Sequence, residues 1–97
     1  MDLISEEIQL EIQRETQRAQ ERYGDFTSTH EALGVLVEEM RELEDAIRLN
    51  AMASVAMEAK QVAAVAARLF VFAERSLTGD MPAFFERSGC TGWEPPR

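Results

Sequence analysis

The chain has little cysteine, few basic residues and few residues that break helices, and each shortage narrows the possible classes of protein. Its one cysteine, Cys90, cannot form an intrachain disulfide. Ten Lys and Arg stand against 18 Asp and Glu, which gives a formal net charge of −8. Because nucleic-acid backbones are bound mainly through clustered Lys and Arg, we expect no nucleic acid as a partner. Small anionic ligands stay possible if a metal ion supplies positive charge.

Long uninterrupted apolar runs are also missing. Residues 51–73 are rich in Ala, Val and Phe, but Glu58, Lys60, Gln61 and Arg68 interrupt them. Charged side chains near the centre of a bilayer are costly, so we expect a buried helix here and no membrane partner. No apolar segment has the flanks of a signal peptide, and we therefore expect a cytoplasmic protein.

The composition that remains is that of a globular protein, with 45% hydrophobic and 29% charged residues. The length of 97 residues predicts a single helical domain over 1–88, followed by an irregular C-terminal tail over 89–97. Pro95 and Pro96 block regular structure in that tail. A chain of this size buries only roughly 60–70% of its unfolded surface, which favours oligomerisation.

Helical periodicity predicts an all-α fold. Apolar residues recur every four or seven positions over 3–23, which predicts a first helix. Ser28 and Glu31 have the spacing of a capping box, in which both side chains satisfy free N–H groups at the start of a helix, so a second helix is expected over 29–49. A turn over 50–53 would lead into a third helix that ends near Leu77.

The end of the chain carries two further signals. Gly79 occupies the position expected just beyond a helix end. Pro82 is a start signal, which favours a short fourth helix over 81–87. Three aromatic residues follow Gly79, and they could stack a base or cover the core or a subunit interface: Phe84, Phe85 and Trp93. His30, the single histidine, is interpreted as a surface residue.

The second helix has two apolar faces. Its wider face predicts the core and consists of Leu33, Leu36, Val37, Met40, Leu43 and Ile47. A second stripe has the same helical spacing and includes two carboxylates: Val35, Glu39, Glu42, Ala46 and Leu49. The third helix is apolar almost all round. We therefore expect an antiparallel helical bundle with a central two-helix hairpin, completed by assembly into a homodimer or homotetramer.

A hairpin with its turn near Asn50 brings oxygen-bearing side chains together. In such a hairpin, residues whose numbers sum to a constant lie side by side, so Glu42 faces Glu58 and Glu39 faces Gln61. Clustered carboxylates in apolar surroundings repel each other and lose hydration, and a cation removes both penalties. Oxygen ligands without His or Cys favour Mg²⁺, with Mn²⁺ possible.

A simpler interpretation of the same residues is also open. These carboxylates could form a solvated acidic face with ion pairs to Arg41, Lys60 or Arg68. Arg68 itself lies two turns beyond Gln61 on the same face of the third helix. It could reach a substrate phosphate or pair with an acid of the second helix.

The segment Glu38-Glu39-Met40-Arg41-Glu42 resembles the EExxE motif of the MazG-like all-alpha nucleoside triphosphate pyrophosphohydrolases. Glu58-Ala-Lys-Gln61 stands where that family has ExxD, with Gln61 in place of the Asp. The resemblance covers roughly residues 20 to 75. It includes the approach Gly34 to Val37 and the segment Val62 to Ala66, but no Lys-rich phosphate-binding segment follows downstream.

The resemblance implies hydrolysis of a nucleoside triphosphate between its α and β phosphates, which gives a monophosphate and pyrophosphate. It also implies that Glu39, Glu42 and Glu58 bind Mg²⁺, with Gln61 as a neutral fourth ligand. Glu38 would orient or deprotonate the attacking water. The alternative function is a helical assembly or regulatory module that keeps this fold without the reaction.

Overall fold

The computed structural model describes residues 3–79, and this part of the chain contains three α-helices and no strand. Helix α1 spans Glu6–Tyr23, α2 spans Thr29–Arg48 and α3 spans Met52–Thr78. The all-α class expected from the sequence is confirmed. Several features named above lie outside the described residues: the expected fourth helix over 81–87, the tail over 89–97, and Phe84, Phe85 and Trp93.

Polar caps and left-handed residues set the ends of these helices. The Ser28 hydroxyl accepts a hydrogen bond from the Glu31 N–H at 3.1 Å, as the capping box predicts. The Glu31 carboxylate reaches one residue further back than expected and accepts from the Thr27 N–H at 3.0 Å. Asn50 has φ 53° in the turn between α2 and α3, and Gly79 has φ 77° after α3. Left-handed values of φ suit Gly and Asn, which explains why the helices end there.

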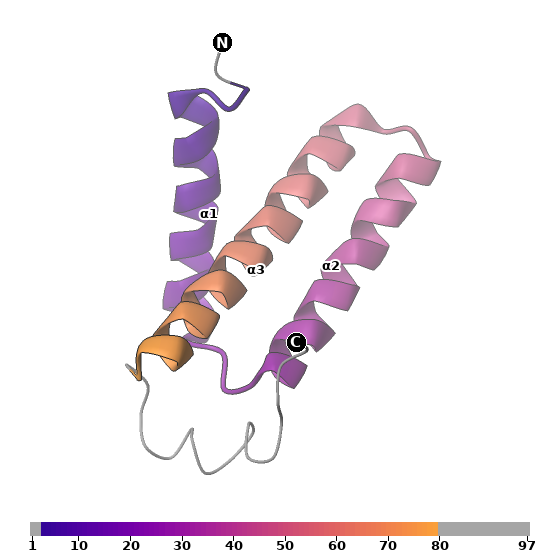
Figure 1. Cartoon of the computed structure of the whole chain (residues 1–97). Helices are drawn as coiled ribbons and strands as arrows, with labels where there is room; N and C mark the ends of the chain where they lie inside the picture. Colours follow the sequence, from indigo (N-terminus) through magenta and orange to yellow (C-terminus); the bar gives the residue numbers. More distant parts are fainter. Residues whose placement is uncertain (1–2, 80–97) are drawn as a thin grey trace.

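Helix α3 lies between the other two helices and packs against both (Figure 1). It runs antiparallel to α2, with the turn over 49–51 joining them, whereas α1 and α3 run in the same general direction. An ion pair between Lys60 and Glu11, at 3.7 Å, connects α3 to α1.

The core lies near the connection between α1 and α2. Phe26 from that connection, Ala32 from α2 and the α3 residues Val65 and Phe72 form a buried cluster. Half-buried apolar residues pack around it: Val35, Leu36 and Leu69. The end of the hairpin near the turn has less buried apolar area, and the carboxylates lie between the core and that turn.

The expected core face of α2 is mostly exposed, so this part of the sequence interpretation was wrong for a single chain. Leu33, Met40 and Ile47 keep 54%, 49% and 56% of their surface exposed. The helix instead approaches α3 through its second stripe, where the small residues Ala32 and Ala46 are buried. Small side chains allow close helix contact. Most of the wider apolar face stays exposed, although Leu36 packs against the core and Leu43 is half-buried.

Exposed apolar residues also occur on α3, which was expected to be buried all round. Phe70 is 66% exposed and Met57 is 52% exposed. No helix within residues 3–79 combines the length and the hydropathy that crossing a membrane requires.

Candidate metal centre

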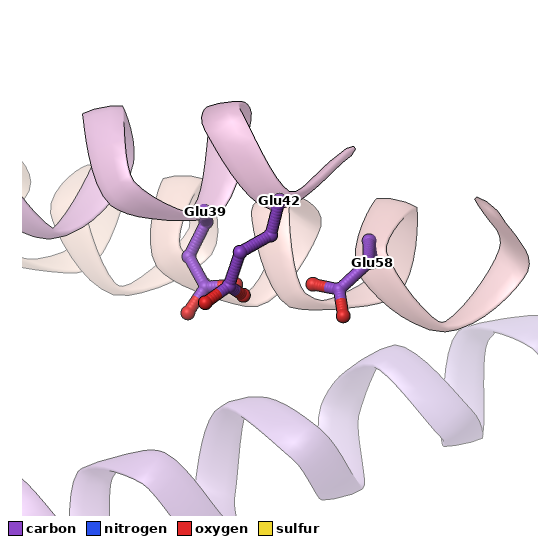
Figure 2. Close-up of side chains that lie close together, drawn as sticks. All are labelled: Glu39, Glu42 and Glu58. Carbon is purple, nitrogen blue, oxygen red and sulfur yellow. The ribbon is translucent and has the colours of Figure 1, made fainter. Parts of the chain in front are cut away.

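Three carboxylates converge between α2 and α3. Glu39 and Glu42 are one helical turn apart on α2, and Glu58 lies on α3 opposite them. Each residue offers a carboxylate oxygen, and these three oxygens all lie within 4.8 Å of one another. Figure 2 shows the three side chains pointing to the same side of the helix pair, with their oxygens toward one another. The hairpin register expected from the sequence therefore places Glu42 near Glu58.

Gln61 and Glu38 lie next to this cluster. The expected pairing of Glu39 with Gln61 puts both on one surface, and both line the same groove. Gln61 is half-buried, whereas Glu38 is exposed. Glu38 also lines this groove.

The carboxylates are only partly solvated. Glu39 and Glu58 are half-buried, and Glu42 is exposed. The Oε2 atoms of Glu39 and Glu58 are buried, and neither has a hydrogen-bond partner among residues 3–79. A buried oxygen without a partner costs roughly 1–3 kcal/mol, and more when it is charged. These two oxygens are therefore suited to a ligand that accepts electron density, such as a proton or a cation.

The same environment changes the proton affinity of the cluster. Burial raises the pKa of Glu39, and the negative charges of Glu42 and Glu58 raise it further. Burial also raises the pKa of Glu58, and Glu42 raises it further, because a protonated Glu58 can share its proton with the Glu42 carboxylate and a charged Glu58 is repelled by it. Both shifts mean that the charged forms are disfavoured without a positive partner.

Ion pairs do not neutralise the cluster within the described part of the chain. The salt bridges found over 3–79 join Arg18 to Glu15, Arg48 to Glu44, Lys60 to Glu11 and Arg75 to Asp25. None of them involves Glu39, Glu42 or Glu58. The ion pairs with Arg41, Lys60 or Arg68 that the alternative interpretation expected are therefore not formed over residues 3–79.

A groove of about 550 Å³ runs over α3 between α1 and α2. Glu38 and Glu39 lie on its α2 wall, and Gln61 lies on its α3 floor. Its α1 wall carries Arg18 and Arg22. The candidate metal centre thus opens through Glu39 into a groove large enough for a small ligand.

Arg68 lies on the floor of this groove, but its guanidinium is engaged with the protein. Its Nη2 donates to the Gly24 carbonyl at 2.9 Å, and its Nε donates to the Gln20 side chain at 3.3 Å. The guanidinium carbon lies 4.3 Å from the centre of the Phe26 ring. Burial lowers the pKa of Arg68, and the nearby charges of Glu31 and Asp25 offset part of this effect. Contact of Arg68 with a substrate phosphate stays a prediction.

Sequence reasoning missed several residues around the site. Phe26, which lies between the expected first and second helices, is buried. Glu15 is a buried acid on the apolar stripe of α1 and pairs with Arg18 at 2.6 Å. Arg18 and Arg22 were not singled out, although their four-residue spacing places both on one side of a helix. The four-residue spacing could have shown that the two arginines lie on the same side of the helix. It does not tell whether that side faces the other helices.

Comparisons of the chain with protein-family models, with curated proteins and with solved structures found no match. The geometry of the site therefore carries the functional argument.

Proposed function

We propose that the chain is a magnesium-dependent nucleoside triphosphate pyrophosphohydrolase, which cleaves between the α and β phosphates to give a nucleoside monophosphate and pyrophosphate. The resemblance of Glu38–Glu42 and Glu58–Gln61 to the motifs of the MazG-like family suggests the reaction. One observation supports a metal site at these residues: three convergent carboxylates include two buried oxygens, of Glu39 and Glu58, that have no hydrogen-bond partner over residues 3–79. A hard divalent cation would satisfy both oxygens and reduce the repulsion between the acids. Mg²⁺ fits this ligand set, and Mn²⁺ could replace it.

In this proposal each acidic residue has a distinct task. Glu39, Glu42 and Glu58 bind the cation, and Gln61 contributes a neutral oxygen. The cation would neutralise phosphate charge and acidify a bound water. Glu38 orients the attacking water and accepts its proton. The water oxygen bonds to the α or the β phosphorus. The bond from that phosphorus to the oxygen that bridges α and β breaks at the same time, and the bridging oxygen leaves with the other of these two phosphates.

The test is pyrophosphate release from a panel of nucleoside triphosphates with Mg²⁺. We expect release from at least one nucleotide, and we expect Glu58→Gln to lower the rate by about 100-fold or more, since even residues that only support a metal ligand are worth 10- to 100-fold. Glu74→Gln is the matched control, because it makes the same change at an exposed position of α3.

Silence across the panel, with the protein folded and Mg²⁺ bound, would contradict the enzyme. That result would favour the alternative of a helical assembly or regulatory module. Gln61 is the observation behind this alternative, because an amide stands where the family that the chain resembles has a carboxylate.

We also propose that the chain forms a homodimer, or a homotetramer built from dimers, through the exposed apolar face of α2. Val37, Met40 and Ile47 of this face all border a shallow depression along the helix. A second copy presenting the same face would cover these residues in a two-fold symmetric contact. A cytoplasmic location stays part of this proposal.

Light scattering should therefore give a mass of at least twice the 11.0 kDa of one chain at micromolar concentration. We expect Met40→Glu to shift the assembly to monomers, because it would bury a charge in the contact. Leu10→Glu makes the same kind of change on the outer side of α1, and it should leave the mass unchanged. A mass near that of one chain for the unmodified protein would rule out the dimer.

A further inference from the structure

The groove beside the carboxylate cluster is lined partly by arginines, and two of these arginines come from α1. Of the ten Lys and Arg in the sequence, three line this groove: Arg18 and Arg22 of α1, and Arg68 of α3. Four acids line it as well, so its formal charge is close to balanced in a chain with a net charge of −8. The groove is thus far less acidic than the chain as a whole, although its formal charge of −1 is still negative.

The arginines and the carboxylate cluster lie at different positions along the groove. Gln61 and Arg68 are seven residues apart on α3, which is about 10 Å along the helix axis. Arg68 contacts Gln20, which lies between Arg18 and Arg22 in the sequence of α1. The arginines therefore gather about two helical turns from the carboxylate cluster, along the length of the groove.

The two arginines of α1 are exposed, in contrast to the buried Arg68. Arg18 is exposed, and its guanidinium forms one ion pair, with the carboxylate of Glu15. Arg22 is exposed and lies over the Tyr23 ring, with 5.3 Å between the guanidinium carbon and the ring centre. The ring contact of Arg22 is exposed and worth about 0–1 kcal/mol, so a phosphate can replace it. Arg18 keeps its pair with the buried Glu15 through Nη1, and the other donors of its guanidinium can contact a phosphate.

We propose that Arg18 and Arg22 bind the phosphate groups of a metal-bound polyphosphate that extends along the groove from Glu39. This inference rests on the proposed function, and it identifies the part of the substrate that α1 contacts. Guanidinium groups match phosphate oxygens in a two-pronged geometry, which favours a phosphate over a halide. This chain has no Lys-rich phosphate-binding segment after its acidic motifs. The positive charge for the phosphates would thus come from α1, which precedes both motifs in the sequence.

The acids in the groove impose a condition on binding. Glu15, Glu31, Glu38 and Glu39 would repel a polyphosphate that carries its full charge. A polyphosphate should therefore bind in the groove only together with Mg²⁺, whose charge offsets theirs. Binding without the metal should be too weak to measure by titration calorimetry.

The experiment measures binding and does not depend on turnover. A nucleoside triphosphate analogue with a nonhydrolysable α–β link is titrated into the full-length protein with Mg²⁺. Arg18→Gln and Arg22→Gln should each weaken binding about tenfold, because a hydrogen bond to a charged group is worth roughly 1.5 kcal/mol or more. Arg14→Gln is the matched control, since Arg14 is exposed on the same helix but does not line the groove.

Two further titrations separate the possible failures. Mg²⁺ alone should bind the arginine variants as it binds the unmodified protein, because these residues do not contact the carboxylate cluster. Inorganic triphosphate should show the same dependence on Arg18 and Arg22 as the nucleotide analogue, because the arginines contact phosphates and not the base. The variant that carries both Arg18→Gln and Arg22→Gln decides the matter. If it binds the analogue as tightly as the unmodified protein does, this inference is overturned and the proposed function stands. Failure of the unmodified protein to bind either polyphosphate with Mg²⁺ would overturn both.

Discussion

Arg68→Ala should lower the free energy of unfolding by about 3 kcal/mol. The substitution removes two hydrogen bonds from a charged donor, each worth roughly 1.5–3 kcal/mol, and a contact with the Phe26 ring worth about 0.5–2 kcal/mol. Removing the cost of burying the charge offsets part of this loss. Since native domains are stable by only about 5–15 kcal/mol, a change of this size is easily measured by urea unfolding.

Two further variants identify the cause of the effect. Arg68→Met keeps most of the side-chain volume and loses the polar contacts, so it should recover only the packing part of the loss. Arg14→Ala removes an exposed arginine and should change stability by no more than about 0.5 kcal/mol. If Arg68→Ala were as stable as Arg14→Ala, the contacts of Arg68 with the connection between α1 and α2 would contribute nothing to the fold.

The helices were predictable because their signals are local. Ser28 caps α2, and Gly79 follows α3 in a left-handed conformation, so the observed bounds differ from the expected ones by only a few residues. The convergence of Glu39, Glu42 and Glu58 was also predictable. A short turn near Asn50 fixes the register of an antiparallel hairpin, and the register alone decides which residues lie opposite each other.

The orientation of α2 was not predictable in the same way. The width of an apolar face indicates that it is covered, but it does not tell whether the same chain or another molecule covers it. In the described structure α3 packs against the narrower face, where Ala32 and Ala46 allow a close approach. Sequence periodicity treats alanine as weakly apolar, and it therefore favoured the face with larger side chains.

The groove could not be predicted because it depends on contacts between distant residues. Its α1 wall is held in place by Lys60 with Glu11 and by Arg68 with Gln20, and both pairs are far apart in the sequence. The burial of Phe26 has the same origin, since the ring fills the space between α2, α3 and Arg68. These are tertiary contacts with no periodic signal, so the position of Arg18 and Arg22 became visible only in three dimensions.

Without metal, the free energy of unfolding should fall as the pH rises above about 4.5. The pKa of Glu39 and of Glu58 is raised above the ordinary value of 4.5 in the folded chain, so the folded state binds more protons than the unfolded state in this window. Stability then decreases with increasing pH until both groups are charged, and protonation at lower pH removes the penalty. Mg²⁺ should reverse this trend at neutral pH, adding about 2.7 kcal/mol at a hundredfold excess over its Kd.

Thermal unfolding from pH 4.5 to 7.5, with and without Mg²⁺, measures both effects. Glu58→Gln should stabilise the metal-free protein at pH 7, because it removes one of the repelling charges, and it should reduce the gain from Mg²⁺. Glu74→Gln should change neither. Gln61→Asp should act in the opposite direction, since a fourth carboxylate destabilises the metal-free protein and attracts the cation more strongly. An unfolding temperature that millimolar Mg²⁺ leaves unchanged would mean that these carboxylates do not form a magnesium site. In that case the raised pKa values of Glu39 and Glu58 would reflect protons held between the helices.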